Sequence, residues 1–303
     1  MTRVLITDPI HDDGIKALRE FAEVGVKTNL KSEELADCIA NYDVLIVRSA
    51  TKVTREVIEA GDKLKLIVRA GVGLDNIDLK AAEARDVKVL NTPEAPTVSV
   101  AELVLGLMLT WARRISQADA SMKRGKWEKS KLAGTELRGK TLGIIGTGRV
   151  GRAVAYRARA FEMKLLAYDV ELNSEFAKKA GVQYVDLKTL LRESDYVTLH
   201  VPLMPQTEHM IGEREFELMK PTAVLVNTAR GEIIDEAALV RVLKEKKIAG
   251  ACLDVYEQEP PEGSPLLRLS NTVLTPHLGA SSKEAQREAA VLAAKKIREE
   301  LVQ

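Results

Sequence analysis

The stretch from Thr141 to Ala155, TLGIIGTGRVGRAVA, constrains the fold more than any other part of the sequence. An apolar run leads directly into the pattern Gly146-x-Gly148-x-x-Gly151, and a helical pattern follows. In a dinucleotide-binding turn, the first glycine permits the tight turn, the second lets a pyrophosphate approach the backbone, and the third lets the helix pack on the strand. The free N–H groups at the helix start then face the phosphates. The stretch therefore predicts a strand–turn–helix unit that binds a dinucleotide.

The next apolar run supports this interpretation, which a glycine pattern alone would leave weak. Residues 164–169 (KLLAYD) end in Asp169, about 20 residues beyond the glycines, as the dinucleotide fingerprint requires. A carboxylate at this point can accept the adenosine ribose hydroxyls and repels a 2′-phosphate, and no arginine follows directly. The sequence therefore favours NAD over NADP. We also expect Arg149 and Val150 to contact the cofactor.

Short β-branched runs alternate with helical patterns along the whole chain, which is typical of parallel sheets covered on both faces. A long helical stretch at 97–124 separates two series of runs, and a last helix is expected at 281–302. Two such series predict an α/β protein with two doubly wound domains. The predicted strands are 4–7, 24–28, 44–49, 64–71 and 87–92 in the first series, and 141–146, 164–169, 196–202, 223–231, 248–255 and 271–277 in the second.

Composition excludes several classes of function. The 303 residues include 45 basic and 44 acidic side chains, and this balance argues against nucleic-acid binding. The two cysteines, Cys38 and Cys252, are far apart and suggest neither a disulfide framework nor a metal site. No secretory segment is visible, and the longest apolar run, 98–112, contains Glu102 and is too short to span a membrane. We expect a cytoplasmic protein without a metal or a membrane partner.

Four polar residues stand at or just after the ends of predicted strands in the second series: Arg230, Asp254, Glu259 and His277. Taken singly, each fits an ordinary surface or loop residue. Together they suit hydride transfer to a 2-oxo acid, in which an imidazole exchanges the proton of the hydroxyl group. A neighbouring carboxylate orients the imidazole, and a guanidinium binds the substrate carboxylate through two hydrogen bonds. Ligands in open α/β sheets bind beyond the carboxyl ends of the strands, so we expect these side chains to converge there.

At these positions the chain resembles the D-isomer-specific 2-hydroxyacid dehydrogenases over essentially its whole length. The resemblance implies that the catalytic residues are Arg230, Glu259 and His277. It also implies a Rossmann NAD-binding domain at 98–283, inserted into a discontinuous, flavodoxin-like substrate-binding domain at 1–97 and 284–303. The stretches that carry it are GIIGTGRVG, NTARG, LDVYEQEPP and TPHLGAS. The cofactor-binding residues expected in total are Gly146, Gly148, Arg149, Val150, Gly151, Asp169, Thr228, Ala229, Asp254, Gly279 and Ala280.

Within the family, the resemblance is greatest to the enzymes that act on 3-phosphoglycerate, on the stretches VRSATKVT, VRAGVGLDNID, NTPEAPTVSVAEL and LGASSKEAQ. Two arginines that end predicted strands, Arg48 and Arg69, favour a substrate with both a phosphate and a carboxylate, although either could instead pair with a structural acid. Similar enzymes are homodimers in which the charged run 121–131 reaches the neighbouring subunit. The substrate-binding residues expected are Arg48, Ser49, Arg69, Gly71, Val72, Gly73 and Arg230, with Lys129 acting from the second subunit.

Other functions stay open at this point. Glyoxylate reductases, hydroxypyruvate reductases and D-lactate dehydrogenases of the family have similar lengths. Some relatives act as NAD-responsive binding proteins without turnover and can keep the same three residues. The sequence ends at Gln303, directly after the last predicted helix, so we expect no regulation through a C-terminal serine-binding domain.

Overall fold

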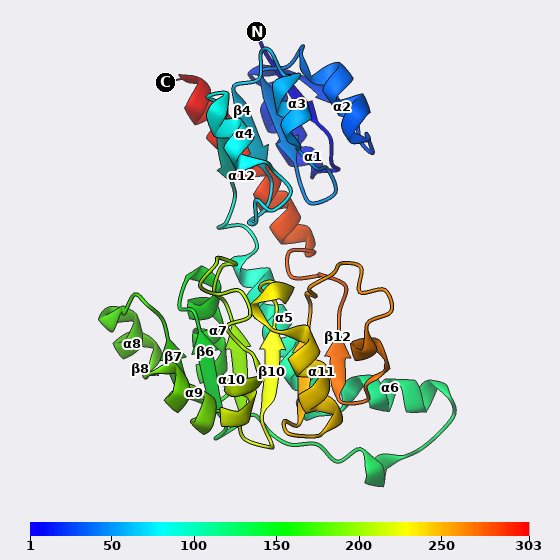
Figure 1. Ribbon diagram of the computed structural model, residues 1–303, viewed down its shortest axis with the longest axis vertical. Helices are drawn as coiled ribbons and strands as arrows, with labels where there is room; N and C mark the ends of the chain where they lie inside the picture. The colour runs from blue at the N-terminus through cyan, green and yellow to red at the C-terminus, as the bar shows by residue number, and fades with distance from the viewer. Residues whose placement is uncertain (303) are drawn as a thin grey trace. The chain divides into compact units, whose positions relative to one another are not determined.

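The computed structural model describes residues 1–302 and divides into two compact units (Figure 1). One unit joins Met1–Ser99 to the segment that starts at Ala280, and the other is Val100–Gly279. Each unit has its own parallel sheet. The predicted fold class, α/β with two doubly wound domains, is confirmed. The functions that we assign to the two domains stay predictions.

The first unit contains a five-stranded sheet in the order β2-β1-β3-β4-β5, with every pair parallel. This is the flavodoxin-like strand order. The strands are β1 (Thr2–Ile6), β2 (Ala22–Val26), β3 (Val44–Val47), β4 (Leu66–Arg69) and β5 (Lys88–Asn91). The helices are α1 (Asp12–Arg19), α2 (Ser32–Ile39), α3 (Arg55–Glu59), α4 (Leu79–Ala84) and α12 (Lys283–Val302).

Both faces of this sheet are buried, which explains the continuous apolar runs of the sequence. Successive residues of a strand point to opposite faces. Val4 accordingly packs in a cluster with residues of α1 and α12, whereas Leu5 packs with residues of α2, α3 and α4. The contact between α1 and α12 is close because Gly14 has no side chain: a Cβ there would lie 2.6 Å from the Ala290 Cβ. The last helix therefore belongs to the first unit.

The second unit contains a seven-stranded sheet in the order β12-β11-β10-β9-β6-β7-β8, again parallel throughout. Chain order reverses between β6 and β9, and ligands of doubly wound sheets bind at such a switch point. The strands are β6 (Thr141–Ile145), β7 (Lys164–Tyr168), β8 (Val182–Tyr184), β9 (Tyr196–Leu199), β10 (Val224–Asn227), β11 (Gly250–Leu253) and β12 (Thr272–Leu274). The α-helices are α5 (Thr97–Ala112), α6 (Ile115–Lys123), α7 (Arg149–Ala160), α8 (Ser174–Ala180), α9 (Leu187–Glu193), α10 (Glu213–Leu218) and α11 (Glu236–Lys244).

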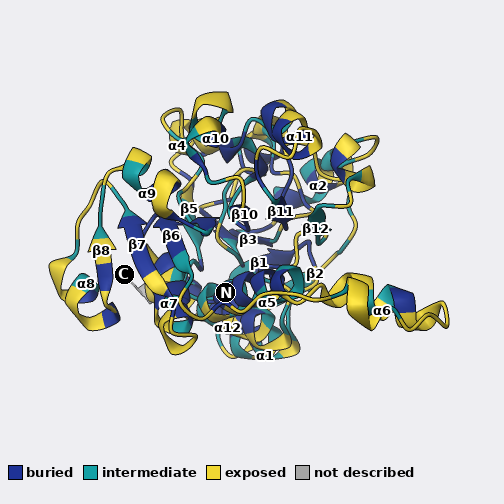
Figure 2. Ribbon diagram, turned by 90° about the horizontal axis from the view of Figure 1, so that it is seen from below, coloured by how far each residue is buried: buried dark blue, intermediate teal, exposed yellow. Residues whose placement is uncertain are grey.

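Three short 3₁₀ helices complete this unit: η1 (Lys129–Lys131), η2 (Gly231–Ile233) and η3 (Pro265–Arg268). Figure 2 shows the central strands of the sheet as buried and the outer faces of the helices as exposed. The two buried clusters of the unit lie on the two faces of the sheet, with Leu225 in one and its neighbour Val226 in the other. None of the helices within residues 1–302 is long and apolar enough to cross a membrane.

The structure differs from the sequence prediction at three places. The helix expected at 97–124 is two helices, because the chain turns at Arg114, whose φ is +53°. Strand β8 was not predicted, since three residues are too few for a periodic signal. Most predicted strands also extend beyond the observed ones, and the extra residues at their carboxyl ends are loop residues such as Arg48 and Arg230.

Candidate active site

The glycine loop after β6 has the geometry that its sequence predicts. Gly146 has a φ of +93°, and a Cβ there would lie 2.8 Å from the backbone of His200. A Cβ on Gly151 would lie 2.0 Å from the Gly146 carbonyl oxygen, so only glycine lets α7 pack this close to the turn. A Cβ on Gly148 would instead point into open space. This residue is the N-cap of α7 and makes no side-chain cap, which leaves its approach clear for a phosphate.

Asp169 follows β7 and lies next to this loop. Its Oδ2 accepts hydrogen bonds from the Thr147 backbone N at 2.6 Å and from the Thr147 hydroxyl at 2.9 Å. Burial opposes ionisation of the carboxyl group, but these bonds and one from the Glu171 backbone hold the pKa of Asp169 below its usual range. A carboxylate therefore stands at the end of β7, as the dinucleotide fingerprint requires. Thr147, which ties it to the glycine loop, was not predicted.

The predicted catalytic residues come from three adjacent strands of one sheet. Arg230 follows β10, Glu259 lies in the loop after β11, and His277 follows β12. The strands β10, β11 and β12 are neighbours and parallel, so their carboxyl ends share one edge of the sheet. The sheet therefore brings these residues to the same edge as the glycine loop.

At this edge, His277 Nδ1 lies 2.7 Å from Glu259 Oε2. Both side chains are partly accessible, with exposed fractions of 49% for His277 and 38% for Glu259. Burial raises the pKa of Glu259, but the bond to His277 and the positive charge of Arg230 outweigh it, so the pKa of Glu259 lies below its usual range. Arg230 and His277 thus both lie close enough to Glu259 to act on its charge.

Asp254 has a structural role at this edge that the sequence did not reveal. Its carboxylate is fully buried and accepts hydrogen bonds from the Thr275 hydroxyl at 2.6 Å, from Leu278 N at 2.7 Å and from Gly279 N at 2.8 Å. Its backbone carbonyl accepts from His277 N at 2.9 Å. His277 itself has a φ of +53°, a conformation that needs such support outside glycine. Asp254 therefore fixes the turn that presents the imidazole, and its predicted contact with the cofactor stays a prediction.

One further residue near the glycine loop, His200, was not predicted. His200 follows β9, and burial lowers its pKa to about 3, so its ring is neutral near pH 7. Its Nε2 lies 3.0 Å from the Thr198 hydroxyl. Thr228, one of the predicted cofactor-binding residues, has a buried hydroxyl that lacks a hydrogen-bond partner within residues 1–302. A position directly after an apolar strand is the one signal that could have drawn attention to His200.

In the first unit, the two predicted substrate arginines come from neighbouring strands, as expected. Arg69 pairs with Val47, the residue before Arg48, in the register of β3 and β4. Arg69 Nε lies 3.4 Å from the Arg48 carbonyl oxygen, and Arg48 Nη1 donates to the Pro9 carbonyl at 3.2 Å. Ser49 is exposed beside them. These cations lie at the carboxyl edge of the first sheet.

The glycine-rich turn after β4 is part of the same edge. The Arg69 guanidinium lies against Gly71, where a Cβ would be 3.4 Å from it. Asn91 Nδ2 donates to the Val72 carbonyl at 2.6 Å, and Thr92 N donates to the Gly71 carbonyl at 2.9 Å. The predicted residues Gly71, Val72 and Gly73 thus form a turn fixed by β5. Lys129 lies in η1 of the other unit, and its predicted role in a second subunit stays a prediction.

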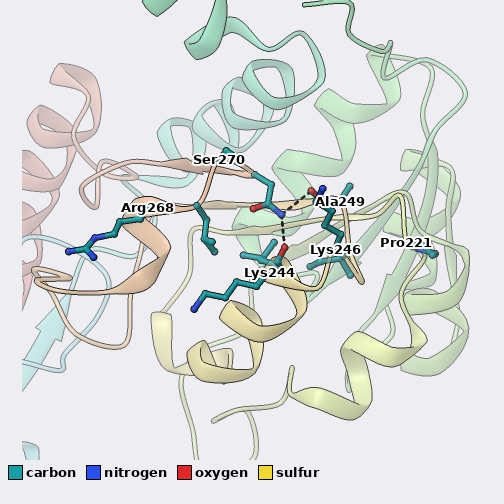
Figure 3. Close-up of a pocket in the computed structure, with 10 residues that line it drawn as sticks. Pro221, Lys244, Lys246, Ala249, Arg268 and Ser270 are labelled. Atoms are coloured by element: carbon teal, nitrogen blue, oxygen red, sulfur yellow. Dashed lines mark hydrogen bonds between the residues drawn. The ribbon is translucent and has the colours of Figure 1, made fainter. Parts of the chain in front are cut away.

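A hollow of about 440 Å³ lies elsewhere on the second unit (Figure 3). Its lining residues precede β10, β11 and β12, so it is at the amino edge of the sheet, opposite the edge that carries Arg230, Glu259 and His277. Lys244 and Arg268 line it, and Figure 3 shows their charged ends extending toward the same side of the view. None of the predicted site residues lines this hollow.

Comparison with known proteins identifies the family. Residues 105–279 match the model of the D-isomer specific 2-hydroxyacid dehydrogenase, NAD binding domain. The chain belongs to the D-isomer specific 2-hydroxyacid dehydrogenases. Membership of this family confirms the predicted resemblance and supports NAD as the cofactor.

Individual relatives cover most or all of the chain. It is 52% identical to a D-3-phosphoglycerate dehydrogenase of Methanocaldococcus jannaschii over 99% of this chain and 58% of that protein. It is 49% identical to a hydroxypyruvate reductase of Thermotoga maritima over 99% of this chain and 98% of that protein. Among solved structures, the TT0316 protein of Thermus thermophilus matches with a TM-score of 0.91 at 35% identity, over 99% of this chain and 97% of that one. The chain thus spans less than two thirds of the M. jannaschii relative.

Proposed function

We propose that the protein is an NAD-dependent dehydrogenase that interconverts 3-phosphoglycerate and 3-phosphohydroxypyruvate, the first step of serine biosynthesis. The observation that carries this proposal is the pair of His277 and Glu259 at 2.7 Å, within reach of the Arg230 charge, at the sheet edge that carries the glycine loop. Relatives named D-3-phosphoglycerate dehydrogenase, 47–52% identical, support the choice of substrate.

The residues at the glycine loop fit a dinucleotide. The uncapped start of α7 supplies backbone N–H groups for the pyrophosphate, and the open face of Gly148 gives it access. The ionised carboxylate of Asp169 accepts hydrogen bonds from ribose hydroxyls, and the unpartnered hydroxyl of Thr228 can turn to the ligand. We expect the further contacts from Arg149, Val150, Ala229, Asp254, Gly279 and Ala280. NAD held by these residues would supply the acceptor for the hydride of C2 of the hydroxy acid.

His277 moves the proton in this mechanism. Because Nδ1 is bonded to Glu259, the ring presents Nε2 to the substrate, where it accepts the hydroxyl proton in oxidation and returns it in reduction. Glu259 stabilises the imidazolium and fixes its orientation. Arg230 binds the substrate carboxylate and polarises the carbonyl group. General acid–base assistance of this kind typically contributes about 10²–10⁴-fold to the rate.

The first unit supplies the phosphate site in our proposal. Arg48, Ser49 and Arg69 lie at one sheet edge, and the turn at Gly71–Gly73 offers backbone N–H groups for the other anionic end. A phosphate and a carboxylate on one small molecule need several cations, because each charged group loses its water on binding. These residues of the first unit are therefore proposed substrate ligands.

A panel of 2-oxo acids tests the proposal. Oxidation of NADH and NADPH is measured with 3-phosphohydroxypyruvate, hydroxypyruvate, glyoxylate and pyruvate. We expect the highest kcat/KM with NADH and the phosphorylated acid, and a loss of about 10–100-fold in Arg48→Ala and Arg69→Ala for this acid alone. Equal activity on phosphorylated and unphosphorylated acids would contradict the proposed substrate.

A second candidate is hydroxypyruvate or glyoxylate reduction. The T. maritima relative of that name matches the chain over 98% of its own length, whereas the M. jannaschii relative is matched over 58%. In this case hydroxypyruvate or glyoxylate would have the highest kcat/KM in the panel. A protein of another class, which binds NAD without turnover, would bind NADH and oxidise none of it.

The assembly and the location that we propose are a homodimer in the cytoplasm. Helix α6 and the segment that follows it extend from the sheet of the second unit and expose Ile115, Met122 and Trp127 (Figure 1). Exposed apolar groups of this kind are typical of a subunit contact. Sedimentation at several protein concentrations tests the dimer. The free thiols of Cys38 and Cys252 fit a reducing compartment.

A further inference from the structure

The loop that follows β3, residues 48–51, carries two of the proposed substrate ligands and is held on one side by Asp8. This carboxylate is buried directly beyond β1. Its Oδ2 accepts from Arg48 N at 2.5 Å and from Thr51 N at 3.2 Å, and its Oδ1 accepts from the Thr51 hydroxyl at 2.9 Å. Both ends of the loop are therefore fixed through their N–H groups.

Asn76 holds the same loop through its carbonyl groups. Asn76 Nδ2 donates to the Arg48 carbonyl at 2.8 Å and to the Thr51 carbonyl at 2.6 Å. These two bonds set the direction of the amide, because a flipped amide would place Oδ1 against two carbonyl oxygens. The Asn76 backbone is itself fixed, since its carbonyl accepts from Val53 N at 2.8 Å. The side chain thus bridges the turn after β4 to the loop after β3.

The carbonyl oxygen of Arg48 accepts hydrogen bonds from Asn76 Nδ2 and also from Arg69 Nε, the latter at 3.4 Å. Asn76 is therefore linked through this one atom to both proposed substrate arginines. A side chain at position 76 must donate two hydrogen bonds to keep this carbonyl and that of Thr51 in place. An aspartate has the same shape and no donor when ionised, and would repel both oxygens.

We propose that Asn76 is a positioning residue for the substrate phosphate: it fixes the loop 48–51 so that Arg48, Ser49 and Arg69 face one anionic group together. This inference rests on the proposed function, because it assigns the purpose of the bridge to phosphate recognition. It makes Asn76 a determinant of the preference for a phosphorylated over an unphosphorylated acid.

The variant Asn76→Asp tests the inference, with Asn76→Ser as a neutral variant that keeps one donor. Asn41→Asp is the matched control, because Asn41 is an exposed asparagine of the same unit. We measure kcat and KM for 3-phosphohydroxypyruvate and hydroxypyruvate, and KM for NADH. In Asn76→Asp, KM for the phosphorylated acid should rise about 10–100-fold, as expected for misplaced charge-assisted hydrogen bonds. The kcat of Asn76→Asp and its KM values for hydroxypyruvate and NADH should change little. The KM of Asn76→Ser for the phosphorylated acid should lie between those of the wild type and Asn76→Asp.

The outcomes separate this inference from the proposed function. A wild-type protein that turns over 2-oxo acids with no preference for the phosphorylated one overturns the proposed substrate. A wild-type preference that persists in Asn76→Asp overturns the positioning role alone. An equal loss of kcat on every substrate, or failure of both Asn76 variants to fold, identifies a general structural role and also overturns the inference.

Discussion

His277 Nδ1 and Glu259 Oε2 are 2.7 Å apart, although the two residues come from different loops of the second unit. The turn at His277 is held separately by Asp254, so the imidazole has a fixed backbone and a fixed ring. A ring that is oriented in this way can present its second nitrogen to a substrate without further rearrangement.

Replacing Glu259 with glutamine should slow the reaction without weakening NADH binding. The pKa of Glu259 lies below its usual range, so the side chain is ionised near pH 7, and its Oε2 lies 2.7 Å from the imidazole. In Glu259→Gln that charge is absent, and kcat should fall about tenfold or more. Steady-state kcat and NADH titration of the variant and the wild type measure both effects. An unchanged kcat would contradict a catalytic role for the pair.

Replacing Gly148 or Gly151 of the loop with alanine should affect different properties of the protein. A Cβ on Gly151 would lie 2.0 Å from the Gly146 carbonyl, so Gly151→Ala should lower the free energy of unfolding by about 1–3 kcal/mol. A Cβ on Gly148 meets only open space, so Gly148→Ala should keep its stability and lose affinity for NADH. Denaturant unfolding and NADH titration of both variants check this. Binding of NADH by Gly148→Ala with wild-type affinity would mean that no phosphate approaches the backbone at Gly148.

Asp169 should determine the choice between NAD and NADP. Its carboxylate is ionised near pH 7 and lies at the end of β7 beside the glycine loop. Asp169→Ala should raise KM for NADH about 10–100-fold, because hydrogen bonds to a charged group are lost. The difference between the KM values for NADH and NADPH should therefore become smaller. The matched control is Glu171→Ala, which removes an exposed carboxylate two residues further on. Equal effects of the two substitutions on KM for NADH would mean that the loss of a negative charge in this region, and not the loss of ribose binding, causes the change.

His200 should weaken the protein in acid. Burial lowers its pKa to about 3 in the folded state, below the value of about 6.5 of an unfolded chain. The unfolded state therefore binds more protons, and stability falls as the pH decreases from about 6.5 toward 3. His200→Gln should lose less stability than the wild type between pH 7 and pH 4. Denaturant midpoints at several pH values test this, and parallel losses in both proteins would show that His200 does not titrate in this way.

The sequence predicted the fold, and the place of the proposed catalytic residues at one edge of a sheet, because both depend on local patterns. Apolar runs with helical stretches between them are sufficient to predict two doubly wound sheets, and the glycine pattern identifies β6 and α7. Arg230 and His277 could be placed at that edge because each follows an apolar run; their catalytic roles stay predictions. The break at Arg114 could not be predicted, since a single residue at positive φ leaves no periodic signal.

The supporting residues of the site could not be predicted for a different reason. Asp254 holds residues 21 to 25 positions away, and Asn76 holds a loop that is 25 to 28 positions away. Each of these contacts depends on which loops the sheet of its own unit brings together, and a single sequence contains no signal for them. Asp8 is an exception in part, because its position directly after the run VLIT could have placed it at the edge of the first sheet.

The most direct test of the account is steady-state oxidation of NADH with 3-phosphohydroxypyruvate by the wild-type protein and by His277→Ala, together with NADH binding by both. We predict turnover by the wild type, a kcat about 10²–10⁴-fold lower in His277→Ala, and the same affinity for NADH in each. A wild-type protein that binds NADH and oxidises none with any 2-oxo acid would contradict the central claim, as would a His277→Ala variant of unchanged kcat.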